Sequence, residues 1–182
     1  MAKIDQQLES CFTEHLPYEI RMMRYEYSKM VALNMIPKAP SVELEMNSAI
    51  EGFCLHARNL MEFFKNKSDF DPREFTVRGY PLNKRFLRDS FLSKLNAQLT
   101  HLSSRRTSDP KEKLHGPDFD ELKRAIEAEI SRMIENLKPE WRSKCTFGDA
   151  SAVIVQLGSS PSSTNYISSA ASVVTDVRTV GS

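Results

Sequence analysis

Lys94 and His101 are the residues whose types and spacing best suit a chemical role. They are seven residues apart in a segment with helical periodicity, so two turns of helix would place both side chains on one face. A cation beside an imidazole suits the handling of a phosphodiester, because the cation offsets phosphate charge and the imidazole transfers a proton near neutral pH. The same pair is also typical of a solvated helix surface, and the spacing alone leaves both interpretations open.

Further polar side chains extend this face. One flank of the expected helix carries, in steps of four, three and four residues, Lys94, Gln98, His101 and Arg105. Arg106 follows directly. If the flank binds nucleic acid, Gln98, Arg105 and Arg106 are the expected RNA contacts.

The chain carries a second polar flank earlier, where Gly52, His56 and Asn59 follow in steps of four and three residues. Gly52 would let another helix approach closely. His56 and Asn59 form either a buried polar pair that ties two helices together, or an outer layer that orients His101. Asn96 is assigned to the same outer layer.

Positive charge is concentrated in residues 73–113. This segment holds ten Lys or Arg against four acidic residues, a local charge of +6 that leaves −5 for the rest of the chain. Such asymmetry attracts a polyanion, unless acidic helices neutralise it in space. The position of the polar flank inside this segment favours nucleic acid.

The apolar pattern is helical up to about residue 140. It predicts helices over residues 3–15, 17–35, 41–65, 82–103 and 118–138. Leu16 and Pro17 should break the first helix from the second, since the residue before a proline avoids the helical region. Ser41 is the expected N-cap of the third helix, and Pro139 should stop the last one.

Each predicted helix has an apolar stripe. The second is expected to bury Tyr18, Met22, Tyr25, Met30 and Leu33. The third should bury Val42, Met46, Ala49, Ile50, Phe53, Ala57, Leu60, Met61 and Phe64. The fourth should bury Leu87, Phe91, Leu95, Leu99 and Leu102, and the last Leu122, Ile126, Ile130, Met133 and Leu137. These stripes predict an all-α fold, an antiparallel up-and-down helical bundle of four to five helices.

The final 37 residues differ from the rest in composition, because they hold nine serines and only three charged residues. We therefore expect one helical domain over residues 1–145 and a Ser-rich, disordered C-terminal tail over 146–182. The tail is assigned no function.

Composition excludes several classes of protein. A net charge of +1 and 40% hydrophobic residues are typical of a soluble globular chain. The N-terminus lacks the apolar core of a signal peptide, and no apolar run approaches the roughly 18 residues of a membrane span, so a cytoplasmic protein is expected. The cysteines and histidines are dispersed, which indicates no disulfide framework, no metal site and no cofactor.

Two segments together resemble a known family. Residues 49–60, AIEGFCLHARNL, and residues 95–102, LNAQLTHL, are similar to the HEPN superfamily, most closely to uncharacterised bacterial members related to abortive-infection proteins. The resemblance covers about residues 15–140. It implies a dimerising bundle of four or five helices, whose motif of Arg followed after four to six residues by His faces a cleft between subunits. Many such proteins are metal-independent ribonucleases of toxin or antiviral systems, whereas others are binding modules.

The motif maps onto Lys94 and His101, so Lys stands where the family has Arg. Arg grips phosphate through a bidentate fork, while Lys supplies only a point charge. In an active enzyme the ribose 2′-hydroxyl would attack the adjacent phosphate, with His101 as general acid or base and Lys94 stabilising the charged transition state. The alternative is a catalytically inactive helical dimer that serves as an interaction module. The expected partners are a second copy of the chain, RNA, and an antitoxin or defence-system protein.

Overall fold

The computed structural model of the protein describes residues 2–88, 91, 93–96 and 114–148. This part of the chain is all-α, as predicted, and contains no strand. Its elements are α1 (Ala2–Ser10), a π-helical turn (Cys11–His15), α2 (Leu16–Leu33), α3 (Pro40–Phe64), the 3-10 turn η2 (Pro72–Glu74), α5 (Gly116–Glu135) and α6 (Pro139–Arg142). None of the described helices is both long and apolar enough to cross a membrane.

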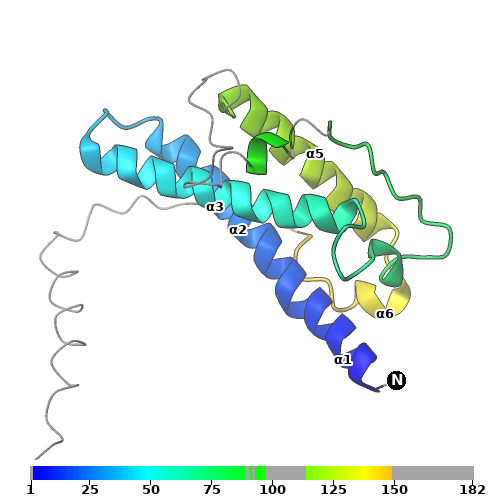
Figure 1. The fold of residues 1–182 in the computed structure, drawn as a ribbon. Coiled ribbons are helices and arrows are strands. Elements are labelled where there is room, and N and C mark those ends of the chain that lie inside the picture. The colour runs from blue at the N-terminus through cyan, green and yellow to red at the C-terminus, as the bar shows by residue number, and fades with distance from the viewer. Residues whose placement is uncertain (1, 89–90, 92, 97–113, 149–182) are drawn as a thin grey trace, which may run out of the picture.

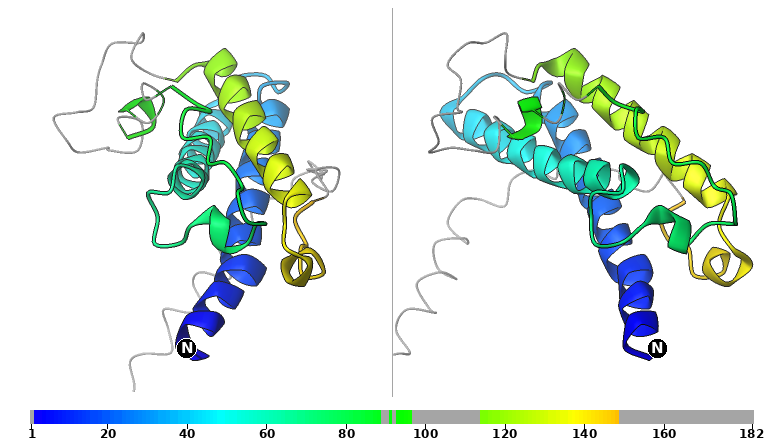
Figure 2. Two further views of the ribbon diagram at one scale, coloured as in Figure 1. Left: turned by 90° about the vertical axis from the view of Figure 1, so that its right-hand side faces the viewer. Right: turned by 45° about the vertical axis from the view of Figure 1, so that its right-hand side comes forward.

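The predicted break at Leu16 and Pro17 is wrong. α1, the π-helical turn and α2 form one continuous rod (Figures 1 and 2), and Leu16 has helical backbone angles of −63° and −45°. The amide of Leu16 donates to the carbonyl of Cys11, five residues back. This wider turn lies directly before Pro17, which has no N–H to donate and occupies the first turn of α2. The helix therefore accommodates the proline instead of ending there.

The apolar face of α2 is only partly the predicted one. Met30 and Leu33 are buried, but Tyr18 and Tyr25 are 50% and 42% exposed. The inward face instead follows from Leu16 through Ile20 and Met23, in steps of four and three residues. A tyrosine can pack its ring on either edge of such a face, so residue type alone misplaced the stripe.

The stripes of α3 and α5 are confirmed. Phe53, Ala57, Leu60 and Met61 of α3 are at most 1% exposed, and α5 buries Leu122, Ile126, Ile130 and Met133. α3 begins at Pro40 with Ala39 as its N-cap, so the expected cap at Ser41 is wrong. Proline is well suited to this first helical position because its missing N–H has no intrahelical partner there.

The core lies where α2, α3 and α5 meet. The chain reverses at residues 34–39, α3 packs on α2, and α5 lies against both (Figure 2). Phe53 of α3 stands 5.9 Å from the ring of Tyr27 on α2 and 5.7 Å from that of Phe119 on α5. One aromatic side chain thus links all three helices.

A second aromatic cluster packs around Phe12, whose ring is 5.2 Å from Phe75, 5.0 Å from Trp141 and 5.4 Å from Phe147. Phe147 is only 2% exposed and belongs to the core, although the predicted boundary places it in the tail. The packed part of the chain therefore continues beyond residue 145. Residues 149–182, which make up most of the predicted tail, lie outside the described residues.

The predicted start of a helix at residue 82 is wrong, because residues 81–88 have no helical backbone. Helical backbone is described at residues 91 and 93–96. Leu87 is buried as predicted, but from an irregular loop. The ammonium of Lys65, a residue only 3% exposed, donates to the carbonyl of Leu87 at 3.1 Å. This bond takes up a carbonyl that a helix would have used.

Candidate nucleic-acid interface

Polar contacts hold the loop of residues 66–88 beside α5. The side-chain amide of Asn83 donates to Glu129 Oε1 at 2.9 Å, and Glu129 is a buried carboxylate of α5. The backbone amide of Val77 donates to the carbonyl of Asn136 at 2.8 Å, just past the end of α5. The outer side of the loop is therefore presented from a fixed backbone.

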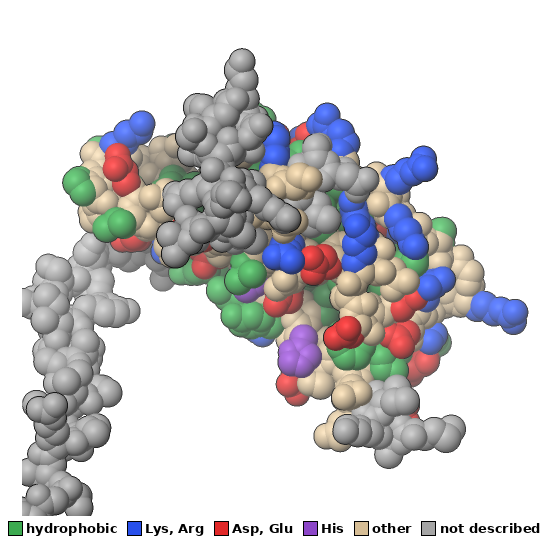
Figure 3. Space-filling view, viewed as in Figure 1, with side chains coloured by type: hydrophobic (Ala, Val, Ile, Leu, Met, Phe, Trp, Pro, Cys, Tyr) green, Lys and Arg blue, Asp and Glu red, His purple; other side chains and the backbone are tan. Residues whose placement is uncertain are grey.

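The exposed cations of this loop include Arg78, Lys84, Arg85 and Arg88. We call these four residues the basic strip. Figure 3 shows Lys and Arg side chains gathered over the side of the molecule where the loop runs along α5. Within the described part of the chain, only Arg88 of the strip forms an ion pair, with Glu121 at 3.2 Å. That pair is solvent-exposed on both sides, so it neutralises little of the strip's charge.

Lys94 forms an ion pair with Asp118. Its ammonium lies 3.3 Å from Oδ2 of Asp118 in the first turn of α5, and its side chain is 28% exposed. The same Asp118 oxygen accepts a hydrogen bond from the backbone amide of His115, the N-cap of α5. Lys94 therefore joins the described helical residues 93–96 to the start of α5.

The electrostatics of Asp118 match this arrangement. Burial raises the pKa of its carboxyl, but the hydrogen bond from the His115 amide and the pairing with Lys94 outweigh burial, so the pKa is lowered from its usual value. Asp118 is thus a carboxylate at neutral pH. Asp118 pairs with the Lys94 ammonium, which the sequence predicts to contact a phosphate.

Most of the predicted flank lies outside the described residues: Gln98, His101, Arg105 and Arg106. Asn96 is described, and it is half-buried. The structure therefore describes Lys94 and Asn96 but not His101, whose imidazole is predicted to share their site.

His56 and Asn59 converge on one carboxylate of α2. His56 Nδ1 lies 2.8 Å from Glu19 Oε2, and the amide of Asn59 donates to the same oxygen at 3.2 Å. The His56 ring also meets the ring of Tyr18 edge-on, 5.6 Å between centroids. These contacts correspond to the first predicted alternative, a polar pair that ties two helices together.

Gly52 serves the same helix pair. A Cβ atom placed there would stand 2.9 Å from Cγ of Glu26 on α2, so the missing side chain makes room for Glu26. The expected close approach at Gly52 is thus seen between α2 and α3.

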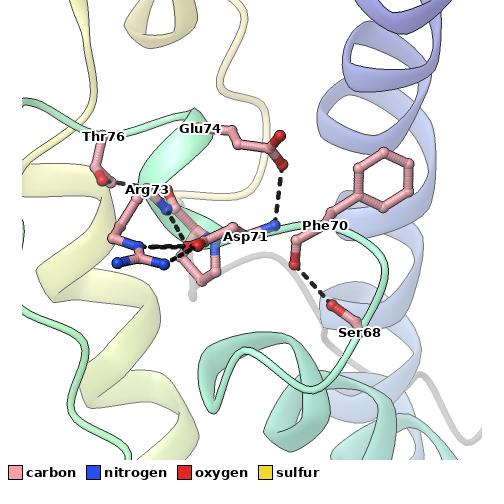
Figure 4. Close-up of polar contacts among 7 residues, drawn as sticks. Ser68, Phe70, Asp71, Arg73, Glu74 and Thr76 are labelled. Atoms are coloured by element: carbon pink, nitrogen blue, oxygen red, sulfur yellow. Dashed lines mark hydrogen bonds and ion pairs between the residues drawn. The ribbon is translucent and has the colours of Figure 1, made fainter.

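Polar contacts hold the loop around η2, and one of them is the pair of Asp71 and Arg73 (Figure 4). The Asp71 carboxylate accepts hydrogen bonds from the backbone amide of Arg73 at 2.9 Å and from its guanidinium Nε at 2.8 Å. The side-chain bond from Arg73 is the main reason why the pKa of Asp71 is lowered. Arg73 lines a cavity of about 500 Å³ together with Arg78 and Lys138.

Arg73 and Arg78 belong to the basic segment of residues 73–113, whereas the sequence does not predict the participation of Lys138. Lys138 lies outside that segment and reaches the cavity only because the chain returns there after α5. No pattern in the sequence links residues so far apart. Within the described ranges, no three His, Cys, Asp or Glu side chains gather closely enough to hold a metal ion.

Comparisons of the chain with protein-family models, with curated proteins and with solved structures find no match.

Proposed function

We propose that the protein binds single-stranded RNA through the basic strip. The observation that carries the proposal is the exposure of Arg78, Lys84 and Arg85 on a loop fixed to α5, with no ion pair among the described residues. Exposed cations along one surface attract the phosphate backbone without regard to sequence. A fixed loop also lowers the entropy that is lost when its side chains bind.

We further propose that bound RNA is cleaved without a metal ion, as the resemblance to the HEPN superfamily implies. His101 would transfer the proton of the 2′-hydroxyl, and Lys94 would offset the developing charge on phosphate. Gln98, Arg105 and Arg106 would contact the strand. This role requires Lys94 to exchange Asp118 for phosphate, and its 28% exposed side chain has access to solvent for that exchange.

The second candidate is an interaction module without catalysis. It is favoured by the Lys94–Asp118 pair and by an exposed apolar tip where α2 turns into α3. At this tip Met35 is 83% and Leu44 71% exposed, and Figure 3 shows apolar side chains at that end. Apolar surface of this kind is typical of contact with another protein.

The remaining expectations belong to the same proposal. An antiparallel up-and-down bundle, a homodimer, an antitoxin or defence-system partner and a cytoplasmic location are what the family resemblance and the composition imply. Sedimentation of the purified protein at tens of micromolar tests the dimer. A concentration on the order of the dissociation constants at which such interfaces are occupied favours the assembled state.

Binding is tested by titrating a single-stranded RNA at several salt concentrations. A Lys84→Ala/Arg85→Ala variant should bind more weakly and show a shallower dependence on salt, by about 0.7 in the logarithmic slope for each phosphate that the variant no longer neutralises. The matched control, Arg21→Ala/Lys38→Ala, also removes two exposed positive charges but lies on α2 and the turn before α3. Equal effects of the two variants would contradict a localised interface.

Cleavage is tested with the same RNA in the presence of a chelator. His101→Ala should lower the rate by about 10²- to 10⁴-fold without loss of folding, because the imidazole supplies proton transfer. Lys94→Arg should preserve or raise the rate by restoring a forked donor. Intact RNA after prolonged incubation with wild-type protein would exclude catalysis and favour the interaction module.

A further inference from the structure

The cavity beside η2 is a cationic pocket of a size that suits a ligand. Its volume of about 500 Å³ falls within the range of roughly 300–1,000 Å³ that is usual for small-ligand sites. Arg73, Arg78 and Lys138 line it, and none of its lining residues is acidic. Positive charge without carboxylates indicates an anionic ligand.

Backbone contacts bring the three cations together. The amide of Lys138 donates to the carbonyl of Phe75 at 3.0 Å, which joins the end of α5 to the loop after η2. The next turn closes with a bond from the Tyr80 amide to the Val77 carbonyl at 3.2 Å, and Gly79 in this turn has φ of +90°. Such a backbone favours glycine, and the turn holds the exposed Arg78 at the rim of the pocket.

Two of the three positive charges are not offset. Arg73 pairs with Asp71 through Nε and Nη2, which leaves Nη1 outside that pair. The Lys138 ammonium donates one hydrogen bond, to the carbonyl of Glu74 at 2.6 Å, and retains two further protons. Arg78 has no ion pair among the described residues. The pocket thus presents a charge of about +2 to a ligand.

The pocket is also lined by one buried aromatic residue, Tyr80. Tyr80 is only 5% exposed, and within the described chain its buried hydroxyl makes no hydrogen bond. Burial raises the pKa of this phenol, so it stays protonated at neutral pH. That oxygen is fully buried, and the guanidinium of Arg132 on α5 lies 4.7 Å from the ring centroid, so Tyr80 anchors the turn to α5 and does not supply a donor to the cavity.

The pocket lies at one end of the basic strip. η2 and α6 lie close together in Figures 1 and 2, and the loop that carries the strip leaves from there along α5. An RNA strand that follows the strip and ends at the pocket would place its terminal phosphate near Arg78. A phosphate within the strand carries one negative charge, whereas a terminal phosphate monoester carries about −1.5 to −2 at neutral pH.

We propose that the pocket lined by Arg73, Arg78 and Lys138 binds the terminal phosphate of an RNA strand whose backbone follows the basic strip. This inference rests on the proposed RNA binding. Arg78 and Lys138 match the charge of the monoester, and the strip contacts the phosphodiesters. The protein would accordingly prefer strands with a phosphorylated end.

The test compares three versions of one RNA, with a 5′-phosphate, with a 3′-phosphate and with hydroxyls at both ends. Wild-type protein should bind one phosphorylated strand about tenfold more tightly than the hydroxyl strand, as one charge-assisted hydrogen bond would give. Arg78→Ala should abolish that preference. The control Arg85→Ala should weaken binding of all three strands by the same factor and keep the preference.

The outcomes separate the two proposals. Preference for either phosphorylated end that depends on Arg78 supports the pocket and tells which end it holds. Salt-dependent binding without any end preference overturns the pocket while RNA binding stands. Preference that survives in Arg78→Ala also overturns it, and absence of binding to every strand overturns both. Unfolding curves of Arg78→Ala should match the wild type, because Arg78 is exposed and unpaired among the described residues.

Discussion

The buried cation Arg24 of the core and the exposed cations Lys84 and Arg85 of the loop of residues 66–88 differ in their partners. Arg24 of α2 is 5% exposed, pairs with Glu127 of α5 through two hydrogen bonds and donates a third to the carbonyl of Phe147. On the loop, Lys84 and Arg85 are exposed and form no ion pair with any described residue. The comparison separates cations that hold the helices together from cations that remain available for a ligand.

Lys94 falls between the two groups. It is paired like Arg24, but its side chain is 28% exposed, against 6% for that of Arg24. The pairing indicates a structural role and the exposure permits a functional one. Separate measurements of stability and of RNA binding in Lys94 variants can therefore decide whether its role is structural or functional.

The largest effect is expected from Arg24→Met. The substitution leaves the half-buried Glu127 carboxylate and the Phe147 carbonyl without their main partner, and breaking such a pair costs about 3–5 kcal/mol. Lys123, 3.5 Å from Glu127, remains as a weaker partner, so the lower end is expected. Denaturant unfolding measures the loss, and RNA binding should not change.

Lys29→Met is the matched control for Arg24→Met. Lys29 lies 3.8 Å from Glu45, a carboxylate whose side chain is 58% exposed, so removal of this pair should cost less than about 1 kcal/mol. Equal stability losses in the two variants would show that burial does not distinguish these cations.

Acid should weaken the same core pair. Burial raises the pKa of Glu127, but the bonds and charge of Arg24 and the charge of Lys123 outweigh burial and lower the pKa in the folded protein. A lowered pKa adds stability above the unfolded value of about 4.3, and that stability is lost as the pH falls through the folded value. Unfolding curves from pH 7 to pH 3 should therefore show wild type losing more stability than Arg24→Met. A constant difference between the two proteins would contradict this.

The helices could be predicted from sequence because burial on α3 and α5 repeats at the helical period. Phe53, Leu60, Ile126 and Met133 each follow that repeat and are buried as expected. The loop could not be predicted in this way. Leu87 is buried from an irregular segment whose backbone carbonyl accepts a hydrogen bond from Lys65, and a single contact between distant residues leaves no periodic signal.

A moderate effect is expected from Asn83→Ala, which removes the bond between the loop and Glu129 of α5. Hydrogen bonds to charged groups contribute about 1.5–3 kcal/mol, and the exposure of Asn83 favours the lower value. The variant should also bind RNA more weakly, because the basic strip would lose its fixed backbone. Lys84→Ala next to it should weaken binding while changing the free energy of unfolding by no more than about 0.5 kcal/mol. RNA binding by Asn83→Ala that equals that of the wild type would show that the basic strip does not depend on the bond between Asn83 and Glu129.

The candidate site could be predicted only in part for a related reason. Helical spacing grouped Lys94 with Gln98 and His101, but the partner of Lys94 in the structure is Asp118, which belongs to another element. Likewise, Lys138 reaches the cavity beside η2 only through the return of the chain after α5. Spacing along one helix reveals neighbours on that helix and gives no information on contacts across the fold.

A small effect on stability is expected at Lys94, and a double-mutant cycle with Asp118 decides its role. Lys94→Met should cost less than about 1 kcal/mol, since the pair is partly exposed. Asp118→Asn keeps an oxygen that can accept the bond from the His115 amide while removing the charge that holds Lys94. If Lys94 is structural, the two substitutions are coupled in unfolding free energy, and Asp118→Asn leaves RNA binding and cleavage unchanged. If Lys94 acts on phosphate, Asp118→Asn frees the ammonium and strengthens RNA binding, and this gain disappears in Lys94→Met/Asp118→Asn. A gain in RNA binding that persists in the double variant would arise from the removed negative charge of Asp118 alone. Lys94 would then have a structural role, like Arg24 in the core.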